Sequence, residues 1–154
     1  MRINQKLNGI VIGGIFTLIS LILTLTFIVP FLTLLPATFL EYIVSIFVNN
    51  KPYSNVGKVT TFILFSMITI SFIIIIVKSR KIQFRNKDIV VIMLVEYFLM
   101  HSFGFYIYWG SSLNYRSDGQ LIFGVLESFP FSSFGFIALG ILIDLVKLNS
   151  EPEY

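Results

Sequence analysis

A cluster of five basic residues between two long apolar runs constrains this chain more than any other feature. The runs cover residues 59–77 and 89–109, and the cations between them are Lys78, Arg80, Lys81, Arg85 and Lys87. Roughly 20 apolar residues in a helix match the ~30 Å hydrocarbon core of a bilayer. Loops rich in Lys and Arg remain on the cytoplasmic side. The sequence therefore predicts two membrane spans joined by a cytoplasmic loop.

The composition extends this interpretation to the whole chain. Its 154 residues are 56% hydrophobic and only 12% charged, whereas soluble domains carry about 25% charged residues. We therefore expect one membrane domain that covers residues 1–154. The chain has no cysteine, which excludes disulfides, thiolate nucleophiles and cysteine-based metal sites.

The hydrophobic pattern predicts an all-α integral membrane protein, a four-transmembrane-helix bundle. The expected spans are about 7–29, 59–77, 89–109 and 121–146. We expect the first span to stop or bend at Pro30, because proline lacks an N–H donor and clashes with the preceding turn. Pro130 lies inside the fourth span, so that span is expected to be kinked or broken.

The distribution of cations predicts the orientation. With four spans, both termini and the loop 78–87 lie in the cytoplasm, which places eight cations inside and three outside. The apolar segment 37–48 is then predicted to be an amphipathic helix in the outer interface, because polar residues recur at spacings of three and four, namely Thr38, Glu41, Ser45 and Asn49. We expect Glu41 to face water; the alternative is that it closes over a pocket of intramembrane polar groups.

Ionisable residues inside the spans are the best functional pointers, since each costs at least ~2.5–3.5 kcal/mol at the membrane centre. Glu96, His101 and Glu127 are such residues. His101 lies roughly 12 Å inward from Trp109 and Glu127 roughly 9 Å inward from the start of its span, so we expect them to meet. A carboxylate beside an imidazole is typical of proton handling, and an interhelical hydrogen-bonded clamp is the structural alternative. The candidate polar site comprises His101, Glu127, Tyr97, Tyr108, Glu96 and Glu41.

Two stripes of small residues predict close helix packing. The first stripe is Gly9, Gly13 and Thr17, continued by Ser20 and Thr24; the second is Gly124, Ser128, Ser132 and Gly135. Small residues allow helix backbones to approach closely in lipid. We expect at least one stripe to pack inside the bundle, and the other is a candidate partner interface.

The remaining patterns assign no activity. A single histidine and no cysteine leave no catalytic, metal or cofactor motif, and the cations at the ends of apolar runs require no nucleic-acid partner. We expect a non-enzymatic membrane subunit or accessory of a larger complex in the bacterial plasma membrane, in contact with lipid and with membrane-protein partners or further copies of itself. One alternative is a homo-oligomeric transporter or proton-coupled carrier that uses His101 and Glu127. Another is a membrane-embedded enzyme that acts on lipids or quinones.

The predicted orientation is testable because the chain contains no cysteine. Cysteines introduced at Ser54 and Ser117 should react with an impermeant thiol reagent added to intact cells, whereas a cysteine at Ser79 should react only after lysis. Labelling of position 79 in intact cells, with protection at 54 and 117, would reverse the orientation.

Overall fold

The computed structural model describes residues 8–48, 53–79, 85–112 and 121–148, and within these ranges the regular secondary structure is entirely α-helical. The helices of the described residues are α1 (Asn8–Thr24), α2 (Ile28–Phe47), α3 (Tyr53–Ser79), α4 (Asn86–Trp109), α5 (Leu121–Ser133) and α6 (Gly135–Leu148).

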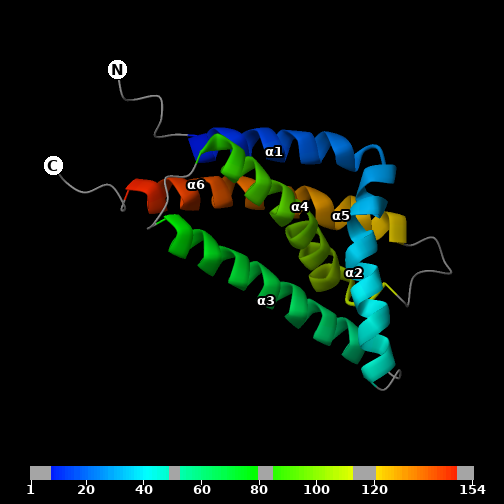
Figure 1. Ribbon diagram of the computed structural model, residues 1–154. Helices are drawn as coiled ribbons and strands as arrows, with labels where there is room; N and C mark the ends of the chain where they lie inside the picture. The colour runs from blue at the N-terminus through cyan, green and yellow to red at the C-terminus, as the bar shows by residue number, and fades with distance from the viewer. Residues whose placement is uncertain (1–7, 49–52, 80–84, 113–120, 149–154) are drawn as a thin grey trace.

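The helices form a bundle with one element across its end (Figure 1). Helix α1 runs alongside α5 and α6, α4 packs next to this pair, and α3 lies on the outer side of α4. Helix α2 runs at a steep angle to α1, at the end of the bundle where α1 ends and α3 begins (Figure 1). The start of α1 and the end of α6 lie together at the opposite end.

Four helical segments are long and apolar enough to cross a membrane: Ile28–Phe47, Asn55–Val77, Asn86–Trp109 and Phe123–Val146. The last three match the expected spans 59–77, 89–109 and 121–146. The first expected span, 7–29, is wrong in its boundaries, because α1 ends at Thr24 and has only 17 residues. The segment 37–48 is also not a separate short helix, because it is the second half of a 20-residue helix, α2.

The break between α1 and α2 has a local cause that differs from the expected one. Phe27 adopts a left-handed backbone conformation with φ 58°, which no helix interior accepts, and α2 begins at the next residue. Pro30 therefore lies in the first turn of α2. The N–H groups of a first turn have no intrahelical acceptor, so the missing donor costs nothing there. The proline begins a helix and does not end one.

The first small-residue stripe packs inside the bundle. A Cβ atom on Gly13 would lie 2.3 Å from the Phe136 carbonyl oxygen, and one on Gly140 would lie 2.3 Å from the Gly9 carbonyl oxygen. The backbones of α1 and α6 are therefore in direct contact. Asp144 strengthens this contact, because its carboxylate accepts hydrogen bonds of 2.9 Å from the N–H groups of Gly9 and Ile10 at the start of α1.

The fourth span is interrupted between α5 and α6. Phe134 separates the two helices, and its N–H bonds the Phe131 carbonyl at 3.3 Å, a tighter turn than the α-helical one. The interruption comes one turn after Pro130, which supplies no N–H donor to its own turn. The expected kink or break in 121–146 is therefore present.

The α1–α6 contact predicts a contrast between two neighbouring glycines. Gly13→Ala should lower the free energy of unfolding by about 1–3 kcal/mol, because the new methyl group would push α1 away from α6. Gly14→Ala is the matched control, since a Cβ at Gly14 meets no atom within 4 Å, and it should leave stability equal or slightly higher. Denaturant unfolding in detergent micelles measures both, and equal losses would contradict the packing argument.

Candidate functional site

The first buried polar cluster surrounds Glu41 of α2. This residue is 0% exposed. Its carboxylate accepts hydrogen bonds from the Tyr106 hydroxyl (2.7 Å), the Ser111 hydroxyl (2.5 Å), the Ser112 N–H (3.1 Å) and the Ser112 hydroxyl. The expectation that Glu41 faces water is therefore wrong. The polar side of α2 faces the protein, because four donors replace the water that the carboxylate would otherwise bind.

Two local features bring these donors to Glu41. Gly110 ends α4 with φ 77°, a conformation that glycine adopts at little cost. The chain turns there, and Ser111 and Ser112 meet the carboxylate beyond the helix end. Tyr106 lies one turn earlier on α4, and Ala37 lies one turn before Glu41 on α2, where its carbonyl accepts a 3.3 Å bond from the Tyr106 hydroxyl. The cluster thus joins α2 to the end of α4.

The second cluster surrounds His101 of α4, which is also 0% exposed. Its Nε2 atom is 2.6 Å from the Ser20 hydroxyl of α1, and its Nδ1 atom is 2.5 Å from the Ser132 hydroxyl of α5. Ser20 in turn lies 2.7 Å from the Ser133 hydroxyl. The imidazole stacks on Phe129 with 4.2 Å between ring centroids. One side chain of α4 is thereby connected to both α1 and α5.

Each neutral tautomer of His101 satisfies this cluster. With hydrogen on Nδ1, the ring donates to Ser132 and accepts from Ser20. With hydrogen on Nε2, the ring donates to Ser20, Ser20 donates to Ser133, and Ser132 donates to Nδ1. When the Ser132 or Ser133 hydroxyl does not donate within the cluster, it donates to a carbonyl of α5, at 3.1 Å for Ser132 and 2.7 Å for Ser133. The cluster is a chain of hydroxyls and one imidazole that runs from α1 to α5.

The structure does not bring His101 and Glu127 together. Both ring nitrogens of His101 bond serine hydroxyls, and Glu127 is exposed on α5. The reason is helical phase, because Ser128 and Ser132 of α5 point inward and the neighbouring position 127 is rotated by about 100°. Of the other candidates, Tyr97 meets the edge of the His101 ring, with 4.7 Å between ring centroids, whereas Tyr108 is exposed.

Glu96 lies apart from both clusters. It is 0% exposed on α4, and its Oε1 atom shares a hydrogen bond with the Ser71 hydroxyl of α3. The hydrogen-bond partners that sequence reasoning missed are Tyr106 and four serines, Ser71, Ser111, Ser112 and Ser133. Serine is common in apolar helices and loops, and its spacing alone does not show which carboxylate or imidazole it meets.

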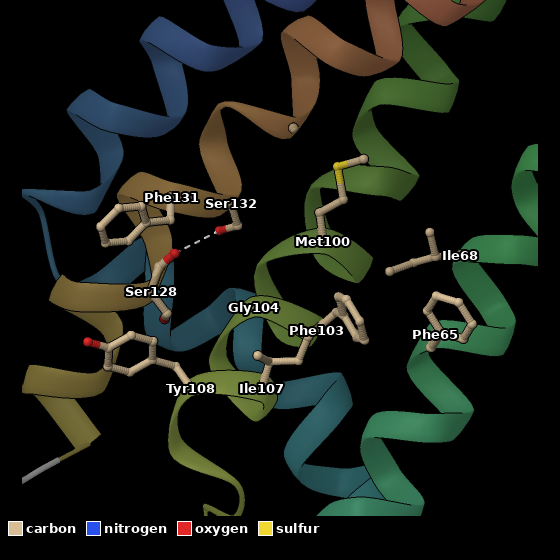
Figure 2. A pocket seen from close by; sticks show the side chains of 11 residues that line it. Phe65, Ile68, Met100, Phe103, Gly104, Ile107, Tyr108, Ser128, Phe131 and Ser132 are labelled. Carbon is tan, nitrogen blue, oxygen red and sulfur yellow. Dashed lines mark hydrogen bonds between the residues drawn. The ribbon is translucent and has the colours of Figure 1, made fainter.

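A lateral groove of about 490 Å³ lies between α3, α4 and the α5–α6 pair, within the size range of ligand pockets. Figure 2 shows Phe65 and Ile68 on the α3 side, with Ser128, Phe131 and Ser132 on the α5 side. The groove wall is apolar, because the Ser128 and Ser132 hydroxyls both bond carbonyls of α5. The remaining lining residues are Met100, Phe103, Gly104, Ile107, Tyr108 and Gly135.

Taken together, the fold defines an α-helical bundle with four helices long and apolar enough to span a membrane. Within the described residues, no group of three or more His, Asp or Glu side chains is arranged to hold a metal ion. Comparison of the chain with protein families, characterised proteins and solved structures finds no match.

The saturation of Glu41 predicts a large effect of a small change. Glu41→Gln should lower the free energy of unfolding by about 3 kcal/mol, because the amide replaces an acceptor oxygen and leaves buried donors unpaired. Glu127→Gln is the matched control and should change stability by less than about 0.5 kcal/mol, since Glu127 is exposed. Denaturant unfolding in micelles compares the two variants, and equal effects would refute the role of the cluster.

Proposed function

We propose that this protein is a non-enzymatic, multi-pass membrane protein that acts as a subunit of a larger membrane complex. The lateral groove carries this proposal: it is the docking site for a transmembrane helix of the partner. Lipid chains are as apolar as the groove, so association there depends on close packing, which small residues permit. Gly104, Ser128, Ser132 and Gly135 provide such a surface, between larger aromatic and aliphatic side chains.

The use of the two small-residue stripes supports this assignment. The small-residue stripe on α1 packs against α6 inside the bundle. On α5, Gly124 packs against Phe105 and Trp109. The other members of the stripe also meet α4, Ser128 and Ser132 at Gly104 and Gly135 at Met100, and this α4–α5 contact lies along the groove. The Ser128 and Ser132 hydroxyls in the groove already have acceptors, so an apolar helix would leave neither of them unpaired.

The proposed placement in the membrane follows from charge and from the arrangement of the helices. In this proposal α1, α3, α4 and the α5–α6 pair cross the bacterial plasma membrane, with both termini and the loop 78–87 in the cytoplasm. Helix α2, although long and apolar enough to span, then lies across the outer end of the bundle, in keeping with its steep angle to α1 (Figure 1). Helix α1 is 17 residues long, and local thinning of the bilayer accommodates a span of that length.

A second candidate function, a homo-oligomeric proton-coupled carrier, is favoured by the His101 cluster. Ser132 belongs both to that cluster and to the wall of the groove. The chain of hydroxyls and imidazole therefore connects the groove with Ser20 of α1. A change of the His101 tautomer would reverse which groups donate and which accept along this chain.

Site-specific photo-crosslinking in intact membranes distinguishes these functions. A photoreactive phenylalanine at Phe65 or Phe131, both exposed at the groove, should yield one principal adduct with a different membrane protein. The same residue at Ile22, exposed on α1 away from the groove, should not. Ile107→Trp should fill the groove and remove the adduct, whereas Ile22→Trp should preserve it.

Two outcomes would overturn the subunit proposal. Adducts that consist only of two copies of this chain would favour the carrier. Equal adducts from Phe65, Phe131 and Ile22 would show that the groove has no specific protein partner.

A further inference from the structure

Glu96 differs from the other buried carboxylates of the described residues in how few donors it meets. Glu41 accepts from four donors, and Asp144 accepts from two backbone N–H groups. Glu96 has the Ser71 hydroxyl near Oε1, while its Oε2 atom is buried with no hydrogen-bond partner among the described residues. An ionised carboxylate needs several donors when water is excluded. Glu96 lacks the surroundings of an anion.

The hydrogen bonds of Ser71 account for the protonation state. The Ser71 oxygen lies 2.8 Å from the Ile68 carbonyl oxygen and also contacts Glu96 Oε1. A hydroxyl has a single hydrogen, so an ionised Glu96 would receive at most one donor and would compete for it with Ile68. With a proton on Oε1, Glu96 donates to Ser71 and Ser71 donates to Ile68. Both bonds are then made, and no charge is buried.

In the described residues, the helix interiors around Glu96 carry no Lys or Arg side chain. Helix α3 has no ionisable side chain between Val59 and Val77, and α1 has none along its length. On α4, His101 is engaged with Ser20 and Ser132, and Tyr97 is neutral. The carboxylates of the neighbouring helices are Glu41 and Asp144, each bound by its own donors, and Glu127, which is exposed.

The position of Glu96 makes the absence of charge important. It lies roughly 15 Å along α4 from Asn86 and roughly 20 Å from Trp109, near the centre of a helix long enough to span a membrane. Helix α3, which covers it, is the least buried of the candidate spans, with 22% of its apolar 18-residue stretch buried against 39–44% in the others. Access of water to Glu96 therefore requires a movement of α3 relative to α4.

We propose that Glu96 and Ser71 form a proton-binding site between α3 and α4, in which Glu96 is a neutral carboxylic acid. The ligand of this site is a single proton, and its release requires α3 to separate from α4. The site lies next to the lateral groove, because Ile68 belongs to both, but Glu96 and Ser71 do not themselves line the groove.

Infrared spectroscopy of the purified full chain in lipid nanodiscs tests this assignment directly. At neutral pH the wild-type protein should show the carbonyl stretch of a protonated carboxylic acid, and this band should shift in D₂O. Glu96→Gln, a neutral isostere that should fold normally, should remove the band. Glu127→Gln is the matched control and should retain the band, because Glu127 is exposed on α5 and takes no part in the Glu96–Ser71 contact.

A second variant tests the role of Ser71. Ser71→Ala removes the acceptor of the proposed Glu96 hydrogen bond, so the band should remain but move in frequency. The proposal is overturned if the wild-type protein has no such band at neutral pH or if the band survives in Glu96→Gln. An unchanged frequency in Ser71→Ala would remove Ser71 from the site.

Discussion

The direct backbone contact between α1 and α6 is the interaction on which the rest of the structure depends. Gly9, Gly13 and Gly140 bring the two helices together at distances that no side chain would allow. This approach places Ser20 of α1 beside Ser133 at the end of α5, and the pair then receives the imidazole of His101. A bulkier contact would separate the groups that hold α4 against α1 and α5.

Polar groups in this chain act chiefly as connections between helices. Glu41 joins α2 to the end of α4, Asp144 joins α6 to the start of α1, and His101 joins α4 to α1 and α5. Each is buried and paired, as an apolar environment without water requires. The groove is different, since its wall is chiefly apolar and its two serine hydroxyls have acceptors on α5. Hydrogen bonds between buried polar groups therefore connect the helices of this chain. In the proposed complex, apolar packing in the groove would hold the partner helix.

Glu96 shows that burial of a carboxyl group has two physical solutions in one chain. Glu41 remains an acceptor because a glycine-ended helix turns hydroxyl and N–H donors toward it. Glu96 meets one serine that already bonds a carbonyl. A bound proton lets Glu96 donate to that serine and leaves no charge buried. The number of donors around a carboxyl group, and not its burial alone, sets its charge in such a site.

The sequence by itself determined three of the long apolar segments, 59–77, 89–109 and 121–146, because hydrophobic length is a local property of the chain. It also indicated the small-residue face of α1, since glycines at a spacing of four repeat on one side of a helix. The tertiary structure decided where the first apolar region divides, because Phe27 takes a left-handed conformation and Pro30 enters the next helix. It also decided the partners of Glu41, Glu96 and His101. Those pairings depend on the rotation of each helix about its axis, and a rotation of about 100° per residue separates Glu127 from the inward face of Ser128. The sequence shows that two residues on different helices lie at similar depths in a bilayer. Whether their side chains meet depends on which faces of the helices pack together.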